Sequence, residues 1–221
     1  QFDAGFVAES GTSEVHASAV HAMDNGIMAY WFGGSREGAA DVKIYQAEFD
    51  GENWLPATPI IDRLTLQRDL DRYIRKVGNP VSYRWDDGTI WVFFVSVSLG
   101  GWAGSSINLI ESTDNGQNWS PAKRLVTSPF LNISTLVRNA PVEYEDGTIG
   151  LPVYHEFLGK FAELLRIDRN GKVLAKDRLS RGTYALQPTI APTSRIEATA
   201  LLLYAGDPPY RVLETHTYDT G

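Results

Sequence analysis

Apolar residues along the chain follow a strand pattern far more often than a helical one. The segments 90–97, 149–154 and 198–204 are rich in β-branched and aromatic side chains, which is typical of buried strands. Helical periodicity is weak, and residues 61–75 are the best candidate for a short, polar helix. The pattern therefore predicts an all-β protein.

A strand, a tight turn and a stronger strand recur four times, beginning near His16, Asn79, Asn139 and Gln187. The expected turns are Asn25-Gly26, Asp87-Gly88, Asp146-Gly147 and Ser194-Arg195. Each unit continues into a third strand and a second turn, so the units cover residues near 14–60, 77–127, 137–181 and 185–221. Repeats of this length with about four short strands each predict β-propeller blades within one propeller domain over residues 1–221.

The second unit contains the stretch ESTDNGQNWS at residues 111–120, with the spacing Ser112-x-Asp114-x-Gly116-x-x-Trp119. An Asp side chain can accept hydrogen bonds within its own turn, and a Gly can supply a corner with positive φ. A calcium loop is the alternative, but the stretch lacks the downstream Glu and the full ligand series. We therefore expect a structural turn that braces the blade.

Composition excludes several classes of function. The 221 residues carry a net charge of −7 and contain no cationic run, which disfavours nucleic acid as a partner. There is no cysteine, no apolar run long enough to span a membrane, and no signal peptide in a chain that starts at Gln1. No sequence feature demands a metal or an organic cofactor. The compartment stays open between bacterial periplasmic, secreted and cytoplasmic.

The series of motifs VHASAV (15–20), WFGGSREGAADVKIY (31–45), GNPV (78–81), LVRNAPV (136–142), LPVYHEF (151–157) and LQPTI (186–190), together with the turn motif, resembles the sialidase superfamily. It is most similar to the bacterial neuraminidase-like group with BNR, or Asp-box, repeats. The resemblance implies a propeller, commonly six-bladed, that acts on sugars with a carboxylate, typically terminal sialic acid. It also implies that the Asp-box lies on the face opposite the active site.

The chemistry of such a substrate, taken without the family resemblance, already requires certain residue types in the site. A carboxylate is bound bidentately by an Arg, and cleavage of a glycosidic bond needs an acid for the leaving oxygen. Sialidases use a Tyr nucleophile that is assisted by a Glu. Arg, Tyr and carboxylate residues near the strand ends of the repeats are therefore the candidate site residues.

The loop after the second strand of the first unit is the first candidate. By resemblance, Asp41 is the expected general acid, Glu37 the alternative acid, and Arg36 a substrate-binding residue. The competing interpretation is a solvated loop in which Asp41 caps a turn. His16 stands where sialidases usually have an Arg, and it could donate one hydrogen bond, act as a base, or simply pack.

The third and fourth units supply the other candidates. Arg138 could bind a carboxylate, and Gln187 lies near the position of the Glu that assists the Tyr nucleophile in sialidases, although Gln cannot act as a base. Tyr154 and Glu156 are candidate catalytic groups and His155 a candidate sugar-binding group. In a strand, Tyr154 and Glu156 point to one side and His155 to the other.

Three further residues are candidate contacts to substrate, each with a structural alternative. Trp102 could stack on a sugar or anchor its loop, Asn79 could hydrogen-bond substrate or backbone, and Arg211 could belong to a carboxylate-binding set.

Three functions remain open from the sequence. The first is an exo-α-sialidase-type glycoside hydrolase acting on a terminal acidic sugar. The second is a propeller hydrolase or lyase directed at uronic-acid polysaccharide, with His16, Tyr154 and His155 as acid and base groups. The third is a non-catalytic carbohydrate-binding propeller fragment. Four units do not complete a six-bladed ring, so we expect a domain incomplete at its C-terminus, whose open blade edges could pair with a second copy.

Overall fold

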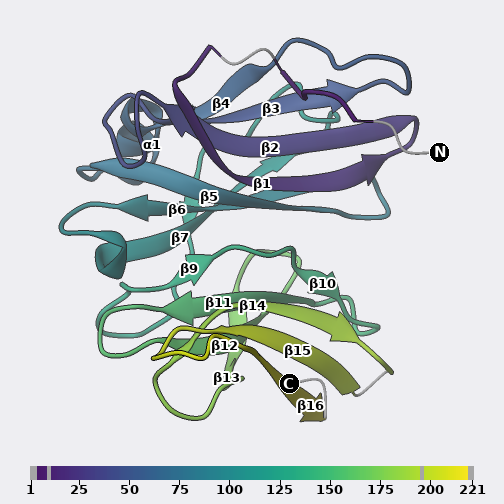
Figure 1. The fold of residues 1–221 in the computed structure, drawn as a ribbon. Coiled ribbons are helices and arrows are strands. Elements are labelled where there is room, and N and C mark those ends of the chain that lie inside the picture. The colour runs from purple at the N-terminus through teal and green to yellow at the C-terminus, as the bar shows by residue number, and fades with distance from the viewer. Residues whose placement is uncertain (1–3, 9–10, 195–196, 219–221) are drawn as a thin grey trace.

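The computed structural model describes residues 4–8, 11–194 and 197–218. It is almost entirely β, and its four sheets are arranged as blades of a β-propeller (Figure 1). The propeller predicted from the repeats is confirmed. In the described part of the chain, no helix is long and apolar enough to cross a membrane.

Blades one and two are four-stranded antiparallel sheets in simple sequential order. Blade one contains β1 (Glu14–Met23), β2 (Gly26–Gly34), β3 (Lys43–Phe49) and β4 (Thr58–Asp62). Blade two contains β5 (Lys76–Arg84), β6 (Ile90–Val97), β7 (Ser105–Ser112) and β8 (Lys123–Arg124), with a short 3-10 turn η1 (Trp102–Gly104) before β7.

Blades three and four repeat this meander with changes at the inner strand and at the end of the chain. In blade three, β9 (Leu136–Val137) and β10 (Val142–Glu143) both pair with β11 (Ile149–His155), followed by β12 (Phe161–Ile167) and β13 (Val173–Arg178). Blade four contains β14 (Ala185–Pro192), β15 (Glu197–Tyr204) and β16 (Val212–Tyr218). The turn expected at Ser194-Arg195 and the end of the chain at residues 219–221 fall partly or wholly outside the described residues.

Helix α1 (Arg63–Leu70) lies inside the segment predicted to be helical and connects blade one to blade two. It begins at Asp62, whose side chain accepts hydrogen bonds from the backbone N–H groups of Leu64 and Thr65, both at 2.8 Å. It ends at Asp71, which has φ of 46°. The helix is therefore a short, capped connection rather than part of a helical layer.

The core lies between neighbouring blades. One apolar cluster, which includes Tyr30 and Phe94, fills the space between blades one and two. A second, which includes Phe93 and Leu151, lies between blades two and three, and a third between blades three and four. Strand β6 is buried along its whole length because both of its faces meet a neighbouring blade.

The Asp-box forms the structural turn that its sequence predicts. Asp114 accepts hydrogen bonds from the hydroxyl of Ser112 at 2.8 Å and from the backbone N–H of Asn118 at 2.9 Å. Gly116 has φ of 81°, and Trp119 packs edge-on against Tyr30 of blade one. These contacts, chiefly those from Asn118 and then from Ser112, lower the pKa of Asp114 to about 2. The motif therefore braces blade two against blade one.

Candidate functional site

The inner strand of each blade is interrupted at the same place. In blades one, two and four the ladder slips between His16 and Ala19, between Gly78 and Val81, and between Leu186 and Thr189. In blade three the equivalent interruption separates β9 from β10. A bulge changes the direction of the side chains around it. Because the four interruptions occur at matching positions of the inner strands, they bring polar residues together at one end of the propeller.

The bulges hold non-glycine residues in the left-handed region of backbone space. Ala17, Asn79 and Gln187 have φ of 52°, 48° and 47°, a conformation that L-residues seldom adopt. Asn139 of blade three joins the set differently, because its amide donates hydrogen bonds to the carbonyl oxygens of Gln187 at 3.0 Å and Pro188 at 2.9 Å. The bulges of blades three and four are therefore fastened to each other.

A cavity of about 310 Å³ opens where these bulges meet. All four blades contribute to its lining: His16, Ala17, Phe32, Glu37, Asn79, Trp102, Leu136, Arg138, Tyr154, Glu156 and Gln187. Eight of the twelve residues that the sequence suggested as site residues are in this lining; the exceptions are Arg36, Asp41, His155 and Arg211.

Glu37 is held on one wall by contacts with two other segments. The indole N–H of Trp102 donates to Oε1 of Glu37 at 3.1 Å, and the backbone N–H of Glu37 donates to Glu14 at 2.8 Å. The ammonium of Lys76 lies 3.6 Å from the centroid of the Trp102 ring. Burial lowers the pKa of Lys76, and the negative charges of Glu37 and Glu156 oppose that change. Lys76 is therefore a cation close to both carboxylates.

His16 forms the adjacent part of the wall. Its ring stacks on Phe32 with centroids 5.5 Å apart, and Nε2 lies 3.4 Å from Oε2 of Glu14. Its side chain keeps 41% of its surface exposed. His16 is thus oriented by its neighbours and still accessible to a ligand.

Tyr154 lies at the buried end of the cavity. Burial, reinforced by the negative charge of Glu156, raises the pKa of its phenol to about 12. Arg138, Asn79 and Gln187 oppose this rise. The phenol is therefore neutral near pH 7 and is a hydrogen-bond or proton donor there.

Glu156 follows β11 directly and is positioned through its backbone. Its N–H and that of Phe157 both donate to the hydroxyl of Ser134, at 3.0 and 2.9 Å. Ser134 is buried and has φ of 64°. This contact fixes the end of β11, so Glu156 enters the same cavity as Tyr154 two residues earlier.

Two predicted residues in the first loop lie elsewhere. Asp41 accepts hydrogen bonds from the backbone N–H and the hydroxyl of Ser35, at 3.0 and 2.9 Å, so its carboxylate closes its own loop. Arg36 is exposed on that loop. Neither residue is in the lining of the cavity that contains Arg138 and Glu156. The turn-capping alternative describes the position of Asp41.

His155 and Arg211 also lie away from the cavity. His155 is buried, its Nε2 is 2.5 Å from Oε2 of Glu163, and its ring stacks on Phe161. It points away from Tyr154 because neighbouring residues of a strand face opposite sides. Arg211 stacks over the ring of Tyr204 at 4.6 Å. Both therefore make contacts within the protein, and neither is in the lining of the cavity.

The sequence did not single out Ala17, Phe32, Leu136 or the nearby Lys76. The position of Ala17 could have been found from the repeats, because it matches Asn79 and Gln187 in its own bulge. Nothing local indicates that Lys76 lies over a tryptophan 26 positions later (102 − 76).

The model of the BNR repeat-like domain family matches residues 25–221. The chain belongs to this family. No curated protein sequence is similar enough to the chain to be matched.

Solved structures share the fold of this BNR repeat-like chain at low sequence identity. A Dyadobacter fermentans protein described as of unknown function has a TM-score of 0.77 and 16% identity, with 97% of this chain and 68% of that chain covered. Trypanosoma rangeli sialidase in complex with sialic acid has a TM-score of 0.69 and 12% identity, with coverage of 95% and 37%. An α-L-arabinofuranosidase from Lactobacillus brevis has a TM-score of 0.62 and 10% identity, with coverage of 93% and 68%. The chain thus spans well under half of the trypanosomal enzyme.

Proposed function

We propose that the cavity at the four bulges is a glycosidase-type active site for a sugar that carries a carboxylate. The observation that supports this most is the gathering of Arg138, Glu37, Glu156 and Tyr154, from two blades, in one cavity. A guanidinium binds a carboxylate bidentately, and two carboxylic groups can serve as acid and base. The fold similarity to a sialidase and an arabinofuranosidase is consistent with a sugar substrate.

In this proposal the substrate carboxylate binds Arg138, and the amides of Asn79 and Gln187 hydrogen-bond the sugar nearby. Glu37 in its protonated form gives its proton to the glycosidic oxygen, and the bond between the anomeric carbon and that oxygen breaks. The incoming water forms a bond to the anomeric carbon while Glu156 takes a proton from it. Tyr154, neutral and buried, donates a hydrogen bond to the sugar. Asp41 has no role, since it closes its own loop.

A second candidate is β-elimination on a uronate, and the protonation state of Tyr154 favours it. A neutral phenol can protonate a leaving oxygen, while His16 at the cavity wall can take the proton next to the carboxylate. Arg138, Asn79 and Gln187 would then stabilise the charge that develops on the carboxylate. Gln187 is compatible with β-elimination, because in that reaction Tyr154 is not a nucleophile and needs no neighbouring Glu to assist it.

Two assays separate the candidates. Release of fluorophore from an aryl sialoside reports hydrolysis, and absorbance of an unsaturated uronate in the near ultraviolet reports elimination from oligouronates. Arg138→Met should lower either reaction at least about a hundredfold, and Glu37→Gln should lower hydrolysis by as much, because each removes a group that acts in that transition state. Asp41→Asn is the matched control and should retain most of the activity.

The outcomes differ clearly. Hydrolysis lost in Glu37→Gln but kept in Asp41→Asn supports the first candidate, whereas near-ultraviolet product lost in His16→Ala supports the second. Hydrolysis that is lost in folded Asp41→Asn and fully kept in Glu37→Gln would contradict the roles given to Asp41 and Glu37. A folded protein that binds acidic sugars without turnover would instead support the non-catalytic, carbohydrate-binding alternative.

A further inference from the structure

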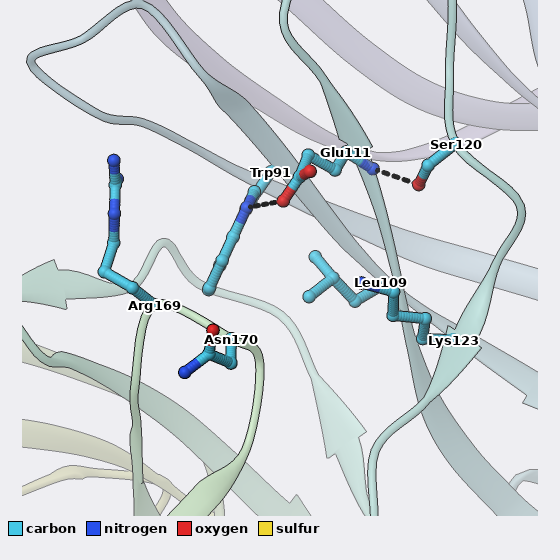
Figure 2. Close-up of a pocket in the computed structure, with 7 residues that line it drawn as sticks. All are labelled: Trp91, Leu109, Glu111, Ser120, Lys123, Arg169 and Asn170. Carbon is cyan, nitrogen blue, oxygen red and sulfur yellow. Dashed lines mark hydrogen bonds between the residues drawn. The ribbon is translucent and has the colours of Figure 1, made fainter.

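A second cavity, of about 280 Å³, lies between blades two and three at the other end of the strands (Figure 2). Its blade-two lining includes Trp91 at the start of β6 and Glu111 at the end of β7, whereas Trp102 of the first cavity lies just before β7. Leu109 lies between Trp91 and the chain entering β8. The two cavities therefore occupy opposite ends of blade two.

Glu111 is fixed in this second cavity by two hydrogen bonds. The indole N–H of Trp91 donates to its Oε2 at 2.8 Å, and its own backbone N–H donates to the hydroxyl of Ser120 at 3.0 Å (Figure 2). Among the described residues, its second carboxylate oxygen has no hydrogen-bond partner. Glu111 is thus an oriented acceptor with capacity left for a ligand, and the Asp-box segment that contains Ser120 helps to hold it.

The opposite wall is the turn between β12 and β13. The guanidinium of Arg169 lies 3.9 Å from the centroid of the Trp85 ring and pairs with Asp87 of blade two. Asp168 accepts hydrogen bonds from the backbone N–H groups of Asn170 and Lys172, both at 2.9 Å. The turn that carries Asn170 is therefore closed by its own aspartate and tied to blade two.

Lys123 completes the lining from β8. It is exposed, and within the described ranges its ammonium makes no hydrogen bond or ion pair. The formal charges at the cavity sum to zero. Arg169 forms an ion pair with Asp87, and the positive charge of Lys123 is equal and opposite to that of Glu111. A ligand with a large net charge would meet one of these groups unfavourably, whereas a neutral ligand would not.

We propose that this second cavity is a binding site for a neutral sugar unit of an oligosaccharide. The lining offers a carboxylate, an amide, a hydroxyl and two cationic groups, which together supply both acceptors and donors for hydroxyl groups. The cavity is close to the lower end of the size range of small-ligand pockets, which suits a single sugar ring. The site is separate from the first cavity and does not depend on the function proposed for it.

Binding of xylotriose, arabinotriose and maltotriose is measured by saturation-transfer NMR and then by calorimetry on the purified chain. At least one of these neutral probes should bind. Lys123→Ala and Glu111→Gln should each weaken that binding about tenfold, because each removes a charged hydrogen-bonding group. Lys172→Ala changes an exposed lysine of the same β12–β13 turn that is not part of the lining, and Glu156→Gln changes the first cavity, so both should bind like the unaltered chain.

Three results would overturn the proposal: no binding of any neutral probe, unchanged binding in either cavity variant, or binding lost in Glu156→Gln. Tighter binding of trigalacturonate than of every neutral probe would also overturn it, since the ligand would then be acidic. Lys123 is exposed, so its variant should fold, which thermal melting checks before the titrations.

Discussion

The indole N–H of Trp102 donates a hydrogen bond to Oε1 of Glu37 at 3.1 Å, although 65 positions separate the two residues. Lys76 lies over the face of the same indole ring, 3.6 Å from its centroid. A cation over the ring and a carboxylate at its N–H are both electrostatically favourable. Trp102 of blade two therefore orients Glu37, which belongs to a loop of blade one.

The first prediction concerns this orientation. Trp102→Phe keeps an aromatic ring under Lys76 but removes the N–H donor. We expect kcat/KM for whichever sugar substrate is turned over to fall about tenfold, because the hydrogen bond that orients Glu37 is lost. Steady-state kinetics check this, with Trp54→Phe as the control, since Trp54 packs on Phe49 away from the cavity. Equal losses in the two variants would show that the hydrogen bond has no special role.

The second prediction concerns His155, which contributes to stability in this structure. Among the described residues, His155→Ala leaves the buried Glu163 with Lys176, at 3.1 Å, as its remaining ionic partner. We expect the free energy of unfolding in urea to fall by about 3 kcal/mol, because a buried charge loses its nearest partner. His16→Ala, at an exposed position, should change it by less than about 1 kcal/mol. A large loss of turnover in His155→Ala without loss of stability would show that His155 takes part in the reaction.

The four-bladed architecture could be predicted because its signals are local. The Asn-Gly and Asp-Gly turns and the alternating apolar residues fix each hairpin within a few positions. The repeated alignment of His16-Ala17, Asn79-Pro80 and Gln187-Pro188 also indicated where the inner strands meet. Much of the first cavity was accordingly foreseen from the repeats and the family resemblance.

The sequence did not show which of the candidate side chains enter the first cavity. Asp41 and Glu37 belong to one short loop, and the hydrogen bonds to Ser35 and Trp102 decide which carboxylate faces the cavity. For His155, strand alternation gave the direction of the side chain, but it did not indicate the contact with the buried Glu163. These outcomes depend on the packing of distant segments, which no local pattern encodes.

The third prediction tests the Asp-box. Hydrogen bonds from Asn118 and Ser112 lower the pKa of Asp114 to about 2, below the ordinary value of 3.8. The stabilisation is therefore fully present above about pH 4 and is lost as the pH falls through 2. Asp114→Asn should lower Tm at pH 6, and the difference from the unaltered chain should shrink toward pH 2. Asp86→Asn, at an exposed aspartate, should show no such trend; a constant difference for Asp114→Asn would contradict the charge argument.

The last prediction concerns His21, whose Nδ1 lies 3.0 Å from the hydroxyl of Ser82. Burial, with a smaller contribution from the positive charge of Arg84, lowers its pKa from 6.5 to about 4. The folded chain thus binds this proton more weakly than the unfolded chain does. Stability should fall as the pH drops from about 6.5 toward 4, by at most about 3 kcal/mol from this group.

His21→Gln should remove that part of the pH dependence, because glutamine does not titrate. Urea unfolding at several values between pH 7 and pH 4.5 measures it, and His216→Gln is the matched control, since His216 is exposed. The slope should become shallower only in His21→Gln. Parallel curves for all three proteins would mean that His21 already accepts a proton in the folded state, and that its burial between blades one and two is looser than the contacts with Ser82 and Tyr30 indicate.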